Sequence, residues 1–277
     1  MNLFTQLNHL MHEYSFAPSR KMAQNFVIDE LLVQKIVAAA RLKKTDHVLE
    51  IGCGTGFLTE ELLKNSHVIG IELDSTFCKI LNDRFGKEIG GKKFILVEGS
   101  FSNIELSGFN KVVSLPPYNL SSEILFRLAS MPEVELMVFV FQREFVAKCV
   151  AQEGFGEYGA LSVLLGYYYD STVVDWDISP ESFFPKPASF SSLVVFSRKK
   201  KVQHLKPGFE LFLKSIFRYK NKKFSNALQK AYPFLKKQLG YDKKEFDLRA
   251  SKLGFAEEKA SVVSPKQFAQ AFETFYK

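Results

Sequence analysis

One stretch, residues 47–60, places an apolar strand directly before three glycines at alternate positions and then a helix-forming run. It reads His-Val-Leu-Glu-Ile-Gly-Cys-Gly-Thr-Gly-Phe-Leu-Thr-Glu, with Gly52, Gly54 and Gly56 in the turn. Glycine lets the backbone turn sharply and lets a ligand approach without meeting a Cβ atom. The N-terminus of the following helix offers free backbone N–H groups. Together these features predict a nucleotide-sized cleft at the carboxyl end of a strand in an α/β sheet.

The residues around the glycines narrow the kind of nucleotide. A dinucleotide fingerprint would have its third glycine at position 57, which is Phe57 here. An acid, Glu50, precedes the first glycine, and a second acid, Glu72, ends the next apolar run. A carboxylate at that second place can accept hydrogen bonds from both hydroxyls of a ribose. The alternative is an ordinary strand–turn–helix with a solvated acid. The glycine turn, the two acids and their spacing together favour a nucleotide site.

Composition limits the class of protein. The 277 residues are 46% hydrophobic, which suffices for a sizeable core and fits one large domain with a smaller one. No uncharged apolar run is long enough to span a bilayer, and the N-terminal residues lack the basic and apolar regions of a secretory signal. Cys53, Cys78 and Cys149 have no metal-ligand spacing, so we expect no metal site, no disulfide and a cytoplasmic protein.

Charge is unevenly distributed along the chain. From Arg198 to the end there are 20 Lys and Arg against 7 Asp and Glu, a net of +13. The first 197 residues hold 17 Lys and Arg against 23 Asp and Glu, a net of −6. A basic C-terminal part beside an acidic part predicts a polyanionic partner, and nucleic acid fits best. The alternative is a solvated helical face rich in lysine.

Apolar runs and helix-forming runs alternate through the first 200 residues, which predicts a parallel sheet wrapped by helices. Residues 1–20 show little periodicity, so we expect a mobile segment there. The helix expected at 29–42 has Leu31, Leu32, Ile36 and Val37 on its apolar face. We expect further helices at 59–64, 75–85, 123–128, 209–217 and 267–276, with strands at 47–51, 68–72, 94–97, 111–114, 135–141, 161–169, 172–178 and 193–196.

Several segments resemble the KsgA family of ribosomal RNA adenine dimethyltransferases, which are class I methyltransferases using S-adenosylmethionine (SAM). Residues 47–60 carry the Glu-x-Gly-x-Gly-x-Gly pattern of motif I, and residues 20–29 resemble the segment that precedes it. Residues 180–191 carry the family's Pro-x-x-Phe-aromatic-Pro-x-Pro signature, with Ser189 in place of its valine. The resemblance covers residues 20–230. It implies a Rossmann-like domain with a mostly parallel seven-stranded sheet at 1–200 and a basic helical RNA-binding domain at 201–277.

The resemblance also implies site residues. The motif IV segment follows the fourth strand and reads Ser114-Leu-Pro-Pro-Tyr-Asn-Leu-Ser. Gln24 and Asn25 are expected to contact the methionine end of SAM, and Lys21 to contact phosphate. Helix capping by Asn25 and burial of Phe183 in the core are the alternatives. The expected cofactor contacts are Asn25, Val27, Gly52, Gly54, Glu72, Ser100 and Leu115, and the expected catalytic residues around the reacting adenine are Leu115, Pro116, Pro117, Tyr118 and Phe183.

Two of these positions depart from the family's pattern. Ser100 replaces an aspartate that accepts a hydrogen bond from the adenine of SAM, and loss of that charge costs roughly 1 kcal/mol. Leu115 stands where the family has an asparagine that, with a backbone carbonyl, accepts the N–H bonds of the target amine. The carbonyl of Pro116 remains, and Tyr118 can stack the flipped base. An alignment displaced by one residue would put Ser114 in place of the asparagine.

The function implied by the resemblance is SAM-dependent N6,N6-dimethylation of adenine in small-subunit ribosomal RNA, with a role in ribosome assembly. We expect the partners to be that RNA and the pre-ribosomal small subunit, without a membrane, and the chain to be a monomer. A catalytically weak or inactive assembly factor is the first alternative, favoured by Leu115 and Ser100. A dinucleotide oxidoreductase is the second, opposed by Phe57 and the basic C-terminal part.

Overall fold

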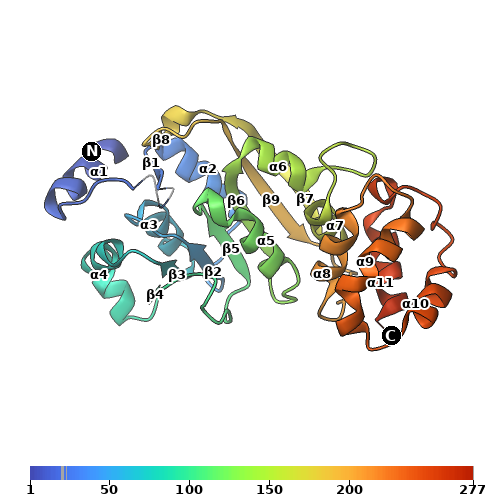
Figure 1. Cartoon of the computed structure of the whole chain (residues 1–277). Helices are drawn as coiled ribbons and strands as arrows, with labels where there is room; N and C mark the ends of the chain where they lie inside the picture. Colours follow the sequence, from blue (N-terminus) through green and yellow to red (C-terminus); the bar gives the residue numbers. More distant parts are fainter. Residues whose placement is uncertain (20–21, 23, 277) are drawn as a thin grey trace. The chain divides into compact units, whose positions relative to one another are not determined.

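The computed structural model describes residues 1–19, 22 and 24–276 (Figure 1). These residues form two compact units. The sequence analysis divides the chain at residue 200 into a methyltransferase domain and an RNA-binding domain. That functional division stays a prediction. Unit 1 comprises Met1–Ile124, Met131–Val146 and Thr172–Arg198, and unit 2 comprises Leu125–Ser130, Ala147–Ser171 and Lys199–Lys277, within the described ranges.

A seven-stranded sheet in the order β4-β3-β2-β5-β6-β9-β7 forms the framework of unit 1, as predicted. Strands β4, β3, β2, β5 and β6 are parallel to their neighbours, and β9 runs antiparallel to β6. Strand β6 is buried at six consecutive positions, which explains its unbroken apolar sequence. The strands are β2 (His47–Ile51), β3 (His67–Glu72), β4 (Phe94–Glu98), β5 (Lys111–Ser114), β6 (Leu136–Gln142), β7 (Tyr169–Ile178) and β9 (Ser191–Arg198).

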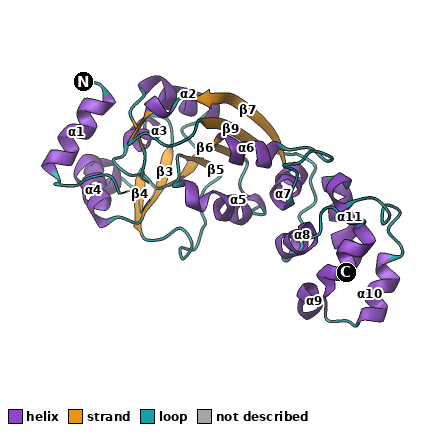
Figure 2. Cartoon of the chain, turned by 45° about the horizontal axis from the view of Figure 1, so that its top comes forward, coloured by secondary structure: helices purple, strands orange, loops and turns teal. Residues whose placement is uncertain are grey.

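Helices cover this sheet (Figure 2). Helix α2 (Glu30–Ala40) packs against β5, β6 and β9, α3 (Phe57–Leu63) packs against β3, and α4 (Ser75–Gly90) packs against β3 and β4. Asp29 begins α2, because its side chain accepts hydrogen bonds from the backbone N–H groups of Leu31 and Leu32. Helices α5 (Ser121–Ala129) and α6 (Arg143–Val150) each contribute residues to both units.

Three local predictions are wrong. Helix α2 buries Leu32 and Ile36 as expected, but Leu31 is 73% exposed and Val33 takes its place in the core. Helix α1 (Leu3–Glu13) forms where we expected a mobile segment, and Leu7 anchors it in the core. The expected strand at 161–169 is instead helix α7 (Ala160–Tyr168), because a short apolar run suits a buried helix as well as a buried strand.

A second, two-stranded sheet brings two distant segments of unit 1 together. Strands β1 (Phe26–Val27) and β8 (Phe183–Phe184) are antiparallel, with Val27 opposite Phe183. The hydroxyl of Ser182, in the short helix η2 (Pro180–Ser182), donates to the Asp29 carboxylate at 2.9 Å. This pairing therefore places the segment before motif I directly beside the Phe-Phe-Pro segment.

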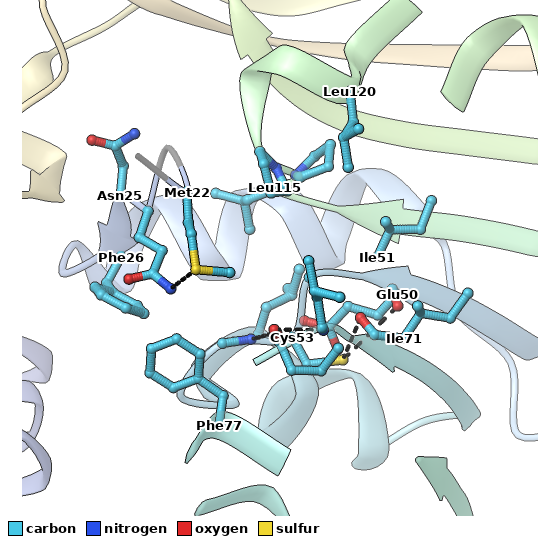
Figure 3. A pocket seen from close by; sticks show the side chains of 18 of the residues that line it. Met22, Asn25, Phe26, Glu50, Ile51, Cys53, Ile71, Phe77, Leu115 and Leu120 are labelled. Carbon is cyan, nitrogen blue, oxygen red and sulfur yellow. Dashed lines mark hydrogen bonds between the residues drawn. The ribbon is translucent and has the colours of Figure 1, made fainter. Parts of the chain in front are cut away.

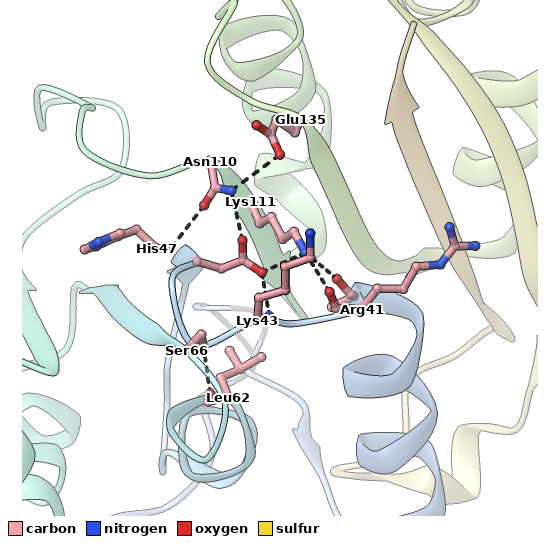
Figure 4. Close-up of polar contacts among 10 residues, drawn as sticks. Arg41, Lys43, His47, Leu62, Ser66, Asn110, Lys111 and Glu135 are labelled. Atoms are coloured by element: carbon pink, nitrogen blue, oxygen red, sulfur yellow. Dashed lines mark hydrogen bonds and ion pairs between the residues drawn. The ribbon is translucent and has the colours of Figure 1, made fainter. Parts of the chain in front are cut away.

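A buried polar network ties the opposite, N-terminal ends of the strands to helix α2 (Figure 4). The Lys111 ammonium lies 2.8 Å from the Asp46 carboxylate, and the two side chains are only 9% and 6% exposed. Lys111 also donates to the carbonyls of Ala40 and Arg41 at the end of α2. Burial alone would raise the pKa of Asp46, but hydrogen bonds from Lys111 and Asn110 hold it below its ordinary value.

Unit 2 is helical around an aromatic core. Phe212, Phe224, Phe246 and Phe268 are completely buried in it. Ser264 and Gln267 form a capping box at the start of the last helix, near the predicted start. None of the helices within the described ranges is long and apolar enough to cross a membrane. The remaining helices are α8 (Phe209–Phe217), α9 (Phe224–Leu239), α10 (Lys243–Ala250), η3 (Ala260–Val262) and α11 (Pro265–Phe275).

Candidate functional site

A pocket of about 310 Å³ opens in unit 1 at the carboxyl ends of β2, β3, β4 and β5 (Figure 3). Its volume falls at the lower end of the range for small-molecule sites. Lys21, which we expected to contact phosphate, lies outside the described residues. All the other predicted cofactor and catalytic residues line the pocket, namely Asn25, Val27, Gly52, Gly54, Glu72, Ser100, Leu115, Pro116, Pro117, Tyr118 and Phe183.

The glycine turn brings two motifs into contact. Gly52 has a φ of +75°, and a Cβ atom on it would lie 3.1 Å from Cδ of Pro117. Its N–H donates to the carbonyl of Ile71 on β3 at 2.8 Å. A larger residue at Gly52 would therefore strain the turn and press on the loop that follows β5. The turn and that loop form adjacent walls of one pocket.

The Glu72 carboxylate is held in a fixed orientation by the backbone. It accepts N–H bonds from Gly54 at 2.8 Å, Leu73 at 2.8 Å and Asp74 at 2.9 Å. Burial raises its pKa, and these three hydrogen bonds oppose the rise. Since a carboxylate has about four acceptor positions, about one remains, which suits one ribose hydroxyl rather than the two that we expected. The side chain is thus preorganised as a hydrogen-bond acceptor.

A second carboxyl group, Glu50, lines the pocket, although we had predicted no role for it. Only 2% of the residue is exposed, and the Thr59 hydroxyl donates to its Oε2 at 2.7 Å. Burial, with a smaller contribution from the charge of Glu72, raises the pKa of Glu50 to about 8. Burial therefore favours the neutral form of this group. A cationic ligand in the pocket would favour loss of its proton.

The loop after β5 places Leu115, not Ser114, in the pocket. The Ser114 side chain is fully buried and donates to the carbonyl of Ile51 at 2.6 Å, whereas Leu115 is among the lining side chains (Figure 3). The displaced alignment that would use Ser114 is therefore wrong. Within the described part of the chain, no donor bonds to the carbonyl of Pro116. That carbonyl is available as an acceptor.

The two aromatic side chains of the site, Tyr118 and Phe183, differ in their surroundings. Tyr118 begins the short helix η1 (Tyr118–Leu120), and its hydroxyl shares a 2.8 Å hydrogen bond with Ser191. Phe183 lies in the core cluster and is only 2% exposed. A base stacked on Phe183 would have to use ring surface that faces the pocket.

The alternative role for Asn25, capping of the following helix, is wrong, because the residue that caps α2 is Asp29.

The pocket also contains residues that we did not predict. Phe77 comes from α4 and packs edge-on against Phe26 of β1, with ring centroids 5.3 Å apart. Met22 and Val140 complete apolar parts of the wall. No local signal marks these positions, since their side chains reach the pocket only through tertiary packing. The lining combines two carboxyl groups, a glycine turn and apolar walls, which suits a nucleoside with a cationic centre.

Comparison with known proteins decides the family. A sequence model described as "Ribosomal RNA adenine dimethylase" matches residues 16–250. The chain belongs to the ribosomal RNA adenine dimethylase family. This is a family of SAM-dependent methyltransferases, so the predicted family, enzyme class and cofactor are confirmed. The dinucleotide oxidoreductase alternative is wrong.

Relatives of this dimethylase family support the same assignment. The chain is 33% identical over 242 residues to the "Probable ribosomal RNA small subunit methyltransferase A" of Methanothermobacter thermautotrophicus, covering 87% of this chain and 85% of that protein. It is 32% identical over 263 residues to the protein of the same name from Thermococcus gammatolerans, covering 95% and 91%.

Solved structures agree with the fold. A dimethyladenosine transferase from Plasmodium falciparum superposes with a TM-score of 0.77 at 25% identity, covering 89% of this chain and 95% of that one. The 23S rRNA methyltransferase ErmE superposes with a TM-score of 0.62 at 22% identity, covering 91% and 100%, which shows a shared fold. The roles of single residues in the pocket remain predictions.

Proposed function

We propose that this protein transfers methyl groups from SAM to N6 of adenine in small-subunit ribosomal RNA, and that it acts in assembly of the small subunit. One observation carries the proposal: the residues that the family resemblance assigns to cofactor and base converge on one pocket around a preorganised Glu72. The names of the relatives, which specify the small subunit, support the RNA substrate. Dimethylation is the proposed product.

The lining residues fit SAM. The acceptor position left on Glu72 suits a ribose hydroxyl, and Gly52 and Gly54 allow close approach of the nucleoside. Ser100 lies near the expected adenine end, and the buried Glu50 suits a cationic group. Bound SAM would supply the electrophilic methyl group. The protein would bind and orient the nucleoside and exclude water from it.

The part of the pocket proposed to bind the target adenine has fewer hydrogen-bond acceptors than the part proposed to bind SAM. Tyr118, fixed through Ser191, is suited to stack an adenine that has left its helix. The Pro116 carbonyl can accept one N–H of the target amine, and the Leu115 side chain can accept none. We therefore propose slow methylation. The same observation favours a second candidate, an RNA-binding assembly factor with little activity.

Primer extension on unmethylated small subunits, incubated with the protein and SAM, tests the proposed function. We expect stops at adenines of the small-subunit RNA and none when S-adenosylhomocysteine replaces SAM. An absence of stops in small-subunit RNA, with stops when large subunits are supplied instead, would contradict the proposed substrate. RNA binding without any stop at high protein excess would favour the assembly factor.

Replacement of Glu72 by alanine is expected to weaken binding of S-adenosylhomocysteine about 5- to 150-fold, or about 1–3 kcal/mol, because the ribose loses its acceptor. Isothermal titration calorimetry measures the change. Glu60→Ala is a matched control, since the Glu60 carboxylate is half exposed and pairs with Arg84. Binding that is unaffected by Glu72→Ala would contradict the role proposed for the glycine turn and this acid.

Residues 201–277 are proposed to bind RNA through their positive charge. Replacing Arg218, Lys220, Lys222 and Lys223 with alanine is expected to flatten the slope of log affinity against log salt by about 2 to 3, because fewer counterions are released. Lys223 already pairs with Glu257, so it contributes least. Filter binding at several salt concentrations measures the slope. An unchanged slope would mean that these four residues do not contact RNA and that another surface binds it.

Localisation in the cytoplasm and a monomeric state are also part of the proposal. The three cysteines are free and buried, which agrees with a reducing compartment. The proposed partner is the pre-ribosomal small subunit, and the basic C-terminal part supports a polyanionic partner of this kind.

A further inference from the structure

A segment of unit 2 between Glu210 and Asp242 is free of acidic residues. Its 31 residues include 8 Lys and Arg and no Asp or Glu. The segment covers most of α8, the turn after it and all of α9 (Figure 1). No carboxylate within the segment offsets its positive charge. Carboxylates from outside it pair with two of its lysines, Lys214 with Glu210 and Lys223 with Glu257, and the remaining cations leave the segment a positive charge that attracts polyanions.

Phe234 is the one exposed aromatic residue of this segment, and the segment's other aromatic residues are buried or half-buried. Phe234 on α9 is 43% exposed, whereas Phe224 and Leu235 of the same helix are completely buried. Cζ of Arg218 lies 4.5 Å from the centroid of the Phe234 ring. Phe234 does not face the core, and its ring and the guanidinium form an exposed cation–π pair.

Lysines flank this pair along α9. Lys230 lies four residues before Phe234 and Lys237 three residues after it, so the three side chains share one face of the helix. Nζ of Lys230 lies 5.6 Å from the ring centroid of Tyr219, which follows Arg218 in the chain. Lys230 and Lys237 are both exposed. In this part of unit 2, aromatic rings therefore lie next to positively charged side chains.

We propose that Phe234 and Arg218 form a stacking site for an unpaired RNA base, with Lys230 and Lys237 contacting the neighbouring phosphates. This inference rests on the proposed RNA substrate and adds a base-binding position to it. Single-stranded RNA is bound by aromatic or guanidinium surfaces that stack on bases, beside cations that meet the backbone. Paired bases do not expose their faces, so the site selects loops, bulges or ends.

Phe234→Ala tests the site, because it removes the stacking surface and no charge. With a small-subunit RNA fragment that contains an unpaired loop, we expect affinity to fall about 5- to 100-fold at an unchanged salt slope. With a perfectly paired RNA duplex, the variant should bind like the wild type. Arg218→Ala should both lower the affinity and reduce the salt slope by about 1.

Leu248→Ala is the matched control. Leu248 is another exposed apolar residue of unit 2, 55% exposed on α10, but it follows the acidic Asp247. Its replacement should leave RNA binding unchanged. Thermal unfolding of both variants checks that unit 2 stays folded, as expected for changes at exposed positions.

Phe234→Trp gives a direct reading of stacking. In a Trp176→Phe background the new tryptophan is the only one in the chain, since the sequence contains a single Trp. We expect wild-type affinity and quenched fluorescence on binding the loop-containing RNA. Wild-type binding by Phe234→Ala, or an unquenched tryptophan in the complex, would overturn the stacking site while leaving the proposed function intact. A wild-type protein that binds no RNA would overturn both.

Discussion

Replacement of Leu115 by asparagine is expected to raise the rate of adenine methylation about 10²- to 10³-fold, the usual effect of one preorganised hydrogen-bonding group in an active site. Leu115 lines the pocket beside the Pro116 carbonyl, so an amide there could accept the second N–H of the target amine. Such an acceptor acts mainly in the transition state. RNA affinity should therefore change far less than turnover.

Single-turnover kinetics with labelled SAM and unmethylated small subunits measures this gain. Leu120→Asn is the matched control, because the same change is made at another residue that lines the pocket. It should give no gain. Fast methylation by the wild type would show that the Pro116 carbonyl or Asn119 already supplies the acceptor. No gain from Leu115→Asn would mean that another feature, such as Ser100, also limits the site.

Replacement of Lys111 by methionine is expected to lower the free energy of unfolding by about 3–5 kcal/mol, because it leaves the Asp46 carboxylate buried without its cation. Urea denaturation measures the loss. Lys64→Met breaks an exposed ion pair with Glu61 and should cost less than about 1 kcal/mol. The double variant Asp46→Asn, Lys111→Met should be more stable than Lys111→Met, since no charge remains buried.

The cost of Lys111→Met should depend on pH. The pKa of Asp46 is depressed in the folded protein, so the pair contributes its full stability above the ordinary aspartate value of 3.8. That contribution is lost as the pH falls through the lower folded value. The difference between the wild type and Lys111→Met should therefore shrink at acid pH. A constant difference would contradict the ion pair as its cause.

Features of the site that depend on local sequence could be predicted. The glycine turn, Glu72 at the end of β3 and the loop after β5 each follow a strand, and parallel strands bring their carboxyl ends to one edge. For the same reason the predicted residues that follow these strands line one pocket, whereas Val27 and Phe183 reach it through the antiparallel pairing of β1 with β8. The capping box at Ser264 is likewise encoded within a few residues.

Features that depend on tertiary packing could not be predicted. The apolar run at 160–168 has no decisive periodicity, and its burial on several sides selects helix α7 over a strand. The raised pKa of Glu50 results from burial by residues distant in the chain. That Ser114 bonds to Ile51, while Leu115 faces the pocket, is set by the register of β5 beside β2.

We propose that the residues of this pocket methylate adenine slowly in small-subunit ribosomal RNA. Mass spectrometry of nucleosides from unmethylated small subunits, incubated with SAM and an excess of wild-type protein, tests it most directly. We expect N6-methylated adenine that accumulates slowly with the wild type and still more slowly with Glu72→Ala. Small subunits that bind the protein and SAM yet yield no methylated adenine, with Leu115→Asn also inactive, would contradict it.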